Sequence, residues 1–357
     1  MTVNHNYYLE LAFQLAERNL GQTRLNPSVG TIVVKNGTVI SSGVTSLNGR
    51  PHSEFNALNR LNDCSGASLY TTLEPCTHHG KTPPCINIIV KKKIKNVYYG
   101  FEDPDLRTFK KAKKILNQKG IKSKLLWIKK YSQFYKSYFI NKKLSIPLIT
   151  AKIAISKDYF TINKKKKWIT NKTSRNFVHL LRSKHDSILS TSKSINKDNS
   201  LLNCRIDGLN NNKPDLFIID LNLRLKKKLS LIKFIKKRKT YLVTSKHNAN
   251  KTMAFKRMGY KIILINQLKD KNDFMLFFKN IYKMGYSRLL IESGLTFLNS
   301  LLDKKIIHEL YILKSNKKLR NSGMNNDDVK YLKNICPILA ANKLNGDNLL
   351  KKSFKNV

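Results

Sequence analysis

Acidic residues and cysteines are both scarce in this chain. It has 22 aspartates and glutamates against 68 lysines and arginines in 357 residues, a formal charge of +46 at pH 7. The five cysteines are odd in number and irregularly spaced, which argues against a framework of structural disulfides. The N-terminal stretch lacks the apolar block and cleavage site of a signal peptide, and no run of eighteen apolar residues predicts a membrane span. We therefore expect a cytoplasmic protein without transmembrane segments.

The excess of positive charge has two interpretations. A basic chain can bind nucleic acid, but a general bias toward Lys, Asn and Ile would give the same total. The lysines are spread over predicted helices, loops and the C-terminal tail, and they do not gather on one aromatic-lined stripe. This distribution favours compositional bias, and the charge would also steer a phosphorylated substrate weakly. Nucleic acid is therefore not the favoured partner, and the sequence leaves a homo-oligomer open.

The length of the chain predicts two domains, and 41% hydrophobic residues suffice for both cores. Helix and strand signals alternate in the first half and predict a layered domain over 1–145. Two β-branched runs flank Asn36-Gly37, a favoured two-residue turn, and predict a hairpin over 30–43. Pro51 is expected at the first position of a helix. The other predicted elements are helices over 7–19, 85–93 and 106–119 and strands over 67–74 and 96–101.

The second half, residues 146–357, also alternates strands and helices and predicts an α/β sheet with parallel pairs. The Lys- and Leu-rich stretch 222–239 is expected to be an excursion over the surface. Strands are predicted over 148–155, 187–191, 215–220, 240–244, 260–265, 287–292 and 308–313, and helices over 172–184, 273–284 and 295–304.

Residues of metal-binding type occur in two short motifs, PHSE at 51–54 and LEPCTHHGKTPPC at 73–85. His52, Cys76 and Cys85 offer one imidazole and two thiolates, which suit zinc and leave its fourth tetrahedral position open for water. An open position is typical of catalytic zinc. Cys85 is expected at a helix start, where backbone amides favour the thiolate. We predict a zinc ion between the N-termini of helices that begin near 52 and 85.

Glu54 lies two residues after His52 and would not complete a closed structural site. A carboxylate beside an activated water fits a proton shuttle to a leaving amine. H-x-E followed by P-C-x-x-C is a signature of zinc deaminases, although eight residues separate the two cysteines here. His78 and His79 are expected to line the substrate entrance or to bond the loop. The remaining cysteines are expected as isolated thiols: Cys64, Cys204 and Cys336.

Further motifs extend along nearly the whole chain. They include NPSVGTIVV from residue 26, EDP from 102, AKIAISKD from 151, KWIT from 167, HLLRSKHDSILS from 179, LFIID from 216 and LLIESG from 289. Together with the two metal motifs they resemble the bifunctional riboflavin-biosynthesis deaminase–reductases of bacteria, of which the long loop between the cysteines is especially typical. The resemblance implies a cytidine-deaminase-like three-layer α/β/α domain over 1–145 and a dihydrofolate-reductase-like α/β domain over 146–357.

The resemblance also implies two consecutive reactions, with Zn²⁺ and NADPH as cofactors. The first domain would hydrolyse the amine of 2,5-diamino-6-ribosylamino-4(3H)-pyrimidinone 5′-phosphate and release ammonia. The second would use NADPH to reduce the ribosyl group to a ribityl chain. The resemblance assigns zinc to His52, Cys76 and Cys85 and the proton shuttle to Glu54.

Local alignment with the family extends the resemblance to residues that would bind small molecules. Arg182 and Arg205 suit the substrate phosphate, since a guanidinium can bind phosphate in a bidentate way. Gly294 precedes a predicted helix whose first amides can receive a cofactor phosphate. The NADPH positions are Ala154, Trp168, Ser194, Asp198 and Gly294. The substrate positions are Asn26, Lys166, Arg182, Leu202, Arg205 and Glu292.

Several positions in the second half depart from the usual family pattern. Tyr159 stands where glycine is usual, at a position where the backbone can need positive φ. Asn199 and Ser200 replace Asp-Pro, Leu295 replaces Pro or Gly, and Lys166 replaces a small polar residue. A deaminase with an eroded reductase domain therefore stays open as an alternative.

Two other classes of protein also fit part of the pattern. The charge and the deaminase signature fit an enzyme acting on a base in RNA or DNA, against which the long cysteine loop and the second α/β domain argue. A zinc-stabilised binding module is disfavoured by Glu54 and by the count of three ligands.

Overall fold

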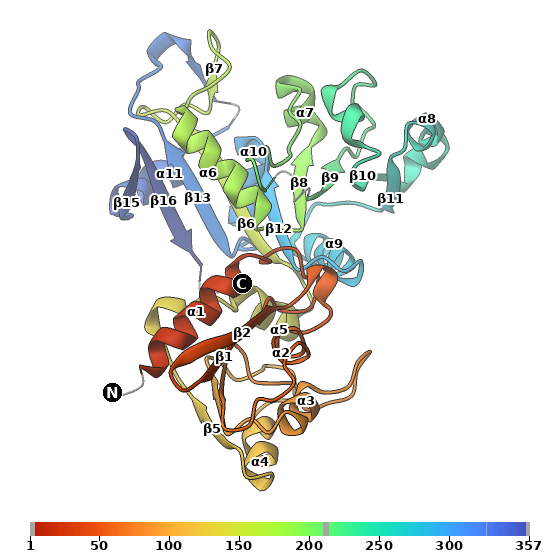
Figure 1. Cartoon of the computed structure of the whole chain (residues 1–357). Helices are drawn as coiled ribbons and strands as arrows, with labels where there is room; N and C mark the ends of the chain where they lie inside the picture. The colour runs from red at the N-terminus through yellow and green to blue at the C-terminus, as the bar shows by residue number, and fades with distance from the viewer. Residues whose placement is uncertain (1–3, 210–213, 326, 355–357) are drawn as a thin grey trace. The chain divides into compact units, whose positions relative to one another are not determined.

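The computed structural model describes residues 4–209, 214–325 and 327–354. The chain divides into two compact units, Met1–Ser145 and Ile146–Val357, each with its own main sheet (Figure 1). Within the described part of the chain, no helix combines the length and the apolar character needed to cross a membrane.

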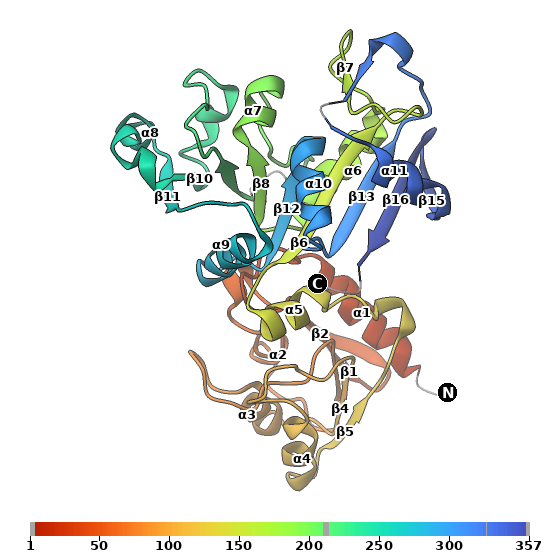
Figure 2. The ribbon, with the colours of Figure 1, turned by 180° about the vertical axis from the view of Figure 1, so that it is seen from behind.

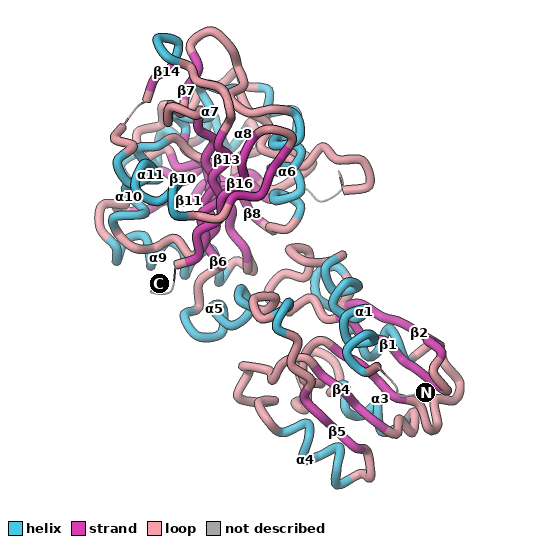
Figure 3. Tube along the Cα trace, turned by 90° about the vertical axis from the view of Figure 1, so that its left-hand side faces the viewer, coloured by secondary structure: helices cyan, strands magenta, loops and turns pink. Residues whose placement is uncertain are grey.

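The first unit is built on a five-stranded sheet of order β2-β1-β3-β4-β5. Its first two strands form the predicted antiparallel hairpin, with Asn36 and Gly37 at φ of 52° and 76° in the turn. The β3–β4 and β4–β5 pairs are parallel. The strands, drawn in magenta in Figure 3, are β1 (Gly30–Lys35), β2 (Thr38–Val44), β3 (Ser68–Thr71), β4 (Asn96–Tyr99) and β5 (Lys122–Leu125).

Helices cover both faces of this sheet, as the predicted three-layer arrangement requires. Because side chains alternate along a strand, Val33 packs in a cluster with residues of α2, α3 and α4, whereas Ile32 and Val34 pack with residues of α1 and α5. The helices are α1 (His5–Glu17), α2 (Ser53–Leu58), α3 (Cys85–Lys91), α4 (Lys111–Gln118) and α5 (Lys136–Leu144).

Two helix starts differ from the predictions in this unit. His52 has extended backbone, φ −71° and ψ 160°, and is the N-cap of α2, so Pro51 lies before the helix and not at its first position. The helix predicted from residue 106 begins only at Lys111, because hydrogen bonds to buried carboxylates hold residues 103–110 as a loop. Strand β5 and helix α5 were not predicted.

The second unit contains a nine-stranded sheet of order β11-β10-β9-β8-β12-β6-β13-β16-β15. The strands from β11 to β13 are parallel, as predicted, and β16 and β15 add an antiparallel edge. They are β6 (Leu148–Ile155), β8 (Ser187–Thr191), β9 (Asp215–Ile219), β10 (Thr240–Ser245), β11 (Lys261–Ile265), β12 (Arg288–Glu292), β13 (Glu309–Lys314), β15 (Ala341–Leu344) and β16 (Asp347–Ser353); β7 (Ile162–Asn163) and β14 (Gly323–Met324) pair separately.

The helices of this unit lie on opposite faces of the sheet. Helix α6 covers one face (Figure 1), whereas α10 covers the other (Figure 2) and contacts α9 through the rings of Phe274 and Phe297. The helices are α6 (Lys172–Ser183), α7 (Ser192–Asp198), α8 (Met253–Arg257), α9 (Lys271–Lys283), α10 (Leu295–Asp303) and α11 (Lys330–Ile335).

The expectation for residues 222–239 is wrong. Leu225, Leu229, Leu231 and Ile235 are buried in the core of the second unit with residues of α6, α7 and β9. The leucines supply apolar surface to the core at intervals of two to four residues, while neighbouring lysines stay exposed. The segment is therefore part of the packed domain, although only a short 3₁₀ helix, Ser230–Phe234, is regular.

Candidate active site

The predicted metal ligands converge in the first unit. One donor atom from each of His52, Cys76 and Cys85 lies within 4.8 Å of the other two. Nδ1 of His52 is 3.7 Å from the sulfur of Cys76 and 3.4 Å from that of Cys85. An imidazole and two thiols at such separations are a donor set for zinc with one position left. The three side chains thus fit the ion that the sequence predicted.

Two helix starts bring these ligands together. His52 is the N-cap of α2, and Cys85 is the first residue of α3, as predicted. The sulfur of Cys76 accepts a hydrogen bond from the backbone N–H of Cys85 at 3.2 Å. Hydrogen bonds from Cys85 and from His52 hold the pKa of the Cys76 thiol below its ordinary value, which favours the thiolate that metals bind.

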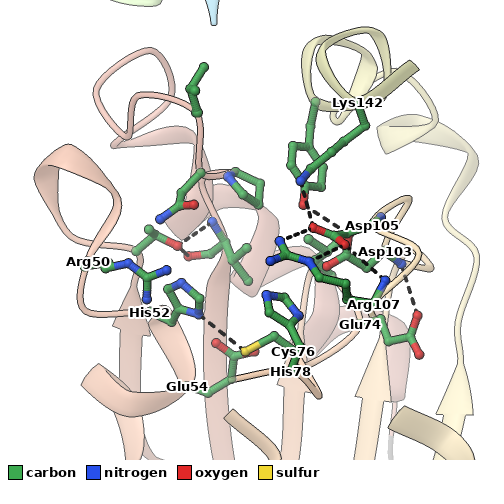
Figure 4. Close-up of a pocket in the computed structure, with 17 residues that line it drawn as sticks. Arg50, His52, Glu54, Glu74, Cys76, His78, Asp103, Asp105, Arg107 and Lys142 are labelled. Carbon is green, nitrogen blue, oxygen red and sulfur yellow. Dashed lines mark hydrogen bonds and ion pairs between the residues drawn. The ribbon is translucent and has the colours of Figure 1, made fainter. Parts of the chain in front are cut away.

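Glu54 lines the same pocket from the first turn of α2, as Figure 4 shows. Its side chain is buried, and one carboxylate oxygen accepts a hydrogen bond of 3.1 Å from the hydroxyl of Ser53. Burial, followed by the charge of Cys76, raises the pKa of Glu54. A raised pKa makes a carboxylate a better proton acceptor, as a proton shuttle requires.

Asn26 lines this pocket, and its side chain is held in place by a tight turn at residues 47–49. Its side-chain amide donates a 2.8 Å hydrogen bond to the carbonyl of Gly49. Gly49 has φ of 93°, and a Cβ there would lie 2.7 Å from the Asn26 amide nitrogen, so only glycine fits this position.

The two neighbouring histidines behave differently. His78 lines the pocket, and its Nδ1 shares a hydrogen bond of 3.0 Å with the Thr108 hydroxyl, in agreement with the prediction. His79 is exposed. All five cysteines lie in the described part of the chain and are free thiols.

An ionic network on the other wall of the pocket was missed in the sequence. Asp105 accepts hydrogen bonds from Arg107 at 2.6 Å and from Lys142 at 2.7 Å (Figure 4). These cations hold the pKa of Asp105 well below its ordinary value. Burial raises the pKa of the neighbouring Asp103 to about 6. The EDP motif contains Asp103 but not Asp105, and Lys142 lies on the unpredicted helix α5.

Glu74 connects this wall to the metal ligands. It is buried two residues before Cys76 and accepts hydrogen bonds from the backbone N–H groups of Asp103, Lys110 and Ala112 at 3.0–3.1 Å. The carboxylate therefore holds both ends of the 103–112 segment, which carries Asp105 and Arg107.

In the second unit, a buried ion cluster joins two residues predicted to bind substrate. Glu292, at the end of β12, accepts from Arg182 of α6 at 2.5 and 3.0 Å, and from Lys152 of β6 at 2.8 Å. Burial alone would raise the pKa of Glu292, but the two cations hold it well below its ordinary value. Arg182 also donates to the carbonyl of Asn203 at 3.0 Å. Lys152 was not predicted.

Arg205 and Leu202 follow on the same segment as Asn203. Arg205 is exposed and donates to the Asn203 side chain at 2.6 Å. Leu202 is buried and has φ of 47°, a conformation that side chains disfavour. Lys166 is exposed, and the structure shows its backbone N–H donating to Asn163 at 3.1 Å.

The predicted NADPH positions lie on β6, around α7 and at the start of α10. Ser194, in the first turn of α7, accepts a 2.9 Å hydrogen bond from the backbone N–H of Gly294, the N-cap of α10. Asp198 is the last residue of α7, and Ala154 lies on β6. Trp168 is 53% exposed, and the cations of Lys167 and Arg175 lie 5.3 and 5.1 Å from the centre of its ring.

The structure confirms positive φ at Tyr159. Its φ is 67°, the region that glycine enters without strain, and the amine of Lys314 lies 3.9 Å from the centre of its ring. Asn199, another departure from the family pattern, has φ of 44°.

The comparisons with known proteins follow the same division into two halves. Residues 2–101 match the family described as the cytidine and deoxycytidylate deaminase zinc-binding region, and residues 147–315 match the RibD C-terminal domain. The riboflavin biosynthesis protein RibD of Buchnera aphidicola is 32% identical over 332 residues, 88% of each chain. The protein of the same name from Aquifex aeolicus is 29% identical over 96% of this chain and 95% of its own.

Solved structures share the fold of the whole chain. RibD of Acinetobacter baumannii superposes with a TM-score of 0.81 at 24% identity, over 97% of this chain and 98% of its own. A diaminohydroxyphosphoribosylaminopyrimidine deaminase/5-amino-6-(5-phosphoribosylamino)uracil reductase from Thermotoga maritima gives the same score and identity over 98% of both chains.

The fold and the site define a bifunctional enzyme in which a zinc-dependent deaminase domain precedes a reductase domain. The match to relatives extends over nearly all of both domains. The chain belongs to the RibD family of riboflavin-biosynthesis proteins, which confirms the resemblance inferred from its motifs.

Proposed function

We propose that the chain deaminates 2,5-diamino-6-ribosylamino-4(3H)-pyrimidinone 5′-phosphate and then reduces its ribosyl group to a ribityl chain. Both activities belong to riboflavin biosynthesis, and the cofactors are Zn²⁺ and NADPH. The observation that carries the proposal is the convergence of His52, Cys76 and Cys85 beside the buried carboxylate of Glu54. The second domain carries the proposed reduction.

In the deaminase domain, we assign the metal to His52, Cys76 and Cys85. Zinc held by these residues would act as a Lewis acid that activates water for attack on the ring carbon bearing the amine. Glu54 takes the proton from the attacking water and delivers it to the leaving amine, which departs as ammonia. Asn26, fixed by its bond to Gly49, orients the pyrimidine or its ribose.

The substrate phosphate is expected at the basic part of the same pocket. Arg50, Arg107 and Lys142 all line it, and guanidinium groups bind phosphate in a bidentate way. Arg107 and Lys142 share the carboxylate of Asp105 on one wall, and Arg50 adds a further cation from the opposite side of the pocket.

In the reductase domain, Arg182, Leu202, Arg205, Lys166 and Glu292 are assigned to the ribosyl phosphate. Glu292 is ionised and paired with two cations, so it accepts hydrogen bonds and orients Arg182.

NADPH is assigned to the other positions predicted for it. Gly294 and Ser194 are joined by a hydrogen bond at the start of α10, and the absence of a side chain at Gly294 leaves room for a close approach of the cofactor. The predicted contacts are Ala154, Trp168, Ser194, Asp198 and Gly294. NADPH supplies the hydride for the reduction.

A cytoplasmic location and a lack of nucleic-acid binding remain predictions, and a homo-oligomer stays open. A gel-shift titration with RNA and single-stranded DNA at moderate salt tests the second of these predictions: salt-sensitive binding at micromolar protein would favour a base deaminase instead.

The reaction itself is tested with purified zinc-loaded protein and the diaminopyrimidine phosphate. We expect ammonia release followed by NADPH oxidation. Glu54→Gln should reduce ammonia release at least about 100-fold, the scale of general acid–base catalysis, while zinc content measured by elemental analysis stays at one per chain. Ammonia release at the wild-type rate in this variant would remove Glu54 from the mechanism. Ammonia release without NADPH oxidation in the wild type would indicate an eroded reductase domain.

A further inference from the structure

Arg238 is a buried cation outside every position assigned above. It lies at the end of the segment 222–239, two residues before β10, and its side chain is 7% exposed. Its guanidinium donates hydrogen bonds to three backbone carbonyls, those of Leu201, Leu202 and Pro214. Burial, followed by the charge of Arg182, lowers the pKa of Arg238 to about 10, so the group is still protonated at neutral pH and all its donors are available.

These carbonyls belong to the segment that leads to Arg205. Leu202 has φ of 47°, and a non-glycine residue keeps this conformation only where its surroundings hold it. The Arg238 guanidinium bonds the carbonyl of Leu202 itself and that of the preceding residue. It therefore fixes the peptide groups on both sides of the strained position.

A second arginine holds the next residue of the segment. The carbonyl of Asn203 accepts hydrogen bonds of 3.0 Å from Arg182 and from His179, and the Asn203 side chain accepts one from Arg205. Three consecutive carbonyls, from 201 to 203, are thus bound by buried guanidinium groups. Arg182 is fixed in turn by Glu292, so the segment is tied to the buried ion cluster on one side and to Arg238 on the other.

We propose that Arg238 is a positioning residue of the reductase domain, which holds residues 201–205 so that Leu202 and Arg205 meet the ribosyl phosphate. This inference rests on the proposed substrate role of Leu202 and Arg205. The guanidinium suits the task because its planar fork presents five donors in fixed directions, whereas a lysine amine presents three donors from a single point. Arg238 contacts the backbone of the segment and needs no contact with substrate.

The test compares Arg238→Gln, Arg238→Lys and a control variant, Arg288→Lys. Arg288 is in the same domain and also donates to a backbone carbonyl, that of Lys184 at 2.8 Å. For each full-length variant, the KM for the deaminated ribosyl phosphate, the KM for NADPH, kcat and the rate of ammonia release are measured. Hydrogen–deuterium exchange of the 199–206 amides is followed on the same samples.

Arg238→Gln should raise the KM for the ribosyl phosphate about tenfold, the scale expected for a binding loss of about 1.4 kcal/mol. The KM for NADPH should change less than about twofold, ammonia release should be unchanged, and exchange at 199–206 should increase. Arg238→Lys should recover part of the lost affinity, because an amine can still bond one or two of the carbonyls. Arg288→Lys should leave both the KM and the exchange of 199–206 unchanged.

An equal rise in both KM values, or a change confined to kcat, would overturn the inference, as would the same KM shift in the Arg288 variant. If the wild type releases ammonia but oxidises no NADPH, the proposed reductase reaction is wrong. Hydrogen–deuterium exchange alone then tests whether Arg238 positions the segment. Faster exchange at 199–206 in Arg238→Gln would still support positioning by Arg238, and unchanged exchange would refute it.

Discussion

Replacing Glu292 with glutamine should destabilise the second domain strongly. The carboxylate is buried and accepts from Arg182 at 2.5 and 3.0 Å and from Lys152 at 2.8 Å. The Glu292→Gln substitution would leave the buried Arg182 and the half-buried Lys152 without a counter-charge, and it would turn an amide N–H toward one of their donors. Removing one partner of a buried ion pair costs roughly 3–5 kcal/mol.

This free energy predicts a measurable thermal shift. For a domain of 150–250 residues, 1 kcal/mol moves the melting temperature by about 2–4 °C, so Glu292→Gln should lower the transition of the second domain by roughly 6–20 °C. Calorimetry resolves the two domains, and fluorescence assigns them, because Trp127 lies in the first unit and Trp168 in the second. In a Trp127→Phe background, Trp168 is the only tryptophan left.

The pH dependence gives a second readout. Because the pKa of Glu292 is depressed in the folded protein, its contribution is present above the unfolded pKa of about 4.3 and is lost as the pH falls through the folded value. The difference between wild type and Glu292→Gln should therefore be full at pH 6–7 and shrink below about pH 4. Asp303→Asn, which removes an exposed carboxylate of the same domain, is the charge control. A shift below about 2 °C at pH 7, or one matched by Asp303→Asn, would refute the reasoning.

Three further outcomes are expected from the structure. At position 159, where φ is 67°, Tyr159→Gly should be about 1 kcal/mol more stable than Tyr159→Ala, because only alanine is strained there; chemical denaturation measures the difference. At Asp105, whose folded pKa is depressed, the stability it contributes is present above about pH 4 and is lost below it, so the melting temperature of wild type should fall more steeply than that of Asp105→Asn between pH 4.5 and 3. Cys85→Ser should lower zinc content to less than about half of one ion per chain under dialysis, measured by elemental analysis.

Each of these expectations has a matched control. Tyr159→Ala and Tyr159→Gly both remove the contact with Lys314, so equal stability of the two variants would mean that positive φ carries no strain. If the melting temperatures of wild type and Asp105→Asn fell equally steeply between pH 4.5 and 3, Asp105 would have no part in the pH response. Cys64→Ser, at a buried cysteine outside the ligand set, should keep full zinc content, and loss of zinc there would point to general unfolding.

Local signals in the sequence predicted the parts of the molecule that depend on short segments. The Asn36-Gly37 turn needs positive φ at both residues, and β6 and β8 begin and end where the β-branched runs do. The sequence also predicted one metal site from His52, Cys76 and Cys85, because the chemistry of these residues is specific and their motifs are distinctive. The helices that bring them together are nevertheless separate in the chain.

Other features depend on contacts that no local pattern shows. In the sequence, the half-buried Lys152 looks like an ordinary strand residue, and its role depends on Glu292, 140 positions later, which lies beside it. The many lysines of 222–239 led to the wrong prediction of a surface segment, because the burial of its leucines depends on the strands and helices around them. The start of α4 was placed too early because Glu74 binds the amides of the preceding loop, a long-range bond that outweighs the local helical signal.

The three amide bonds to Glu74 limit how the deaminase pocket can open. They link Glu74, two residues before Cys76, to both ends of the 103–112 segment. The backbone around Glu74 and the 103–112 segment must therefore move as one body. Separating the 103–112 segment from Glu74 would break three charge-assisted hydrogen bonds at once. Any widening of the pocket is therefore expected at the opposite rim, where Arg50 and Thr82 are joined by one exposed hydrogen bond that water can readily replace.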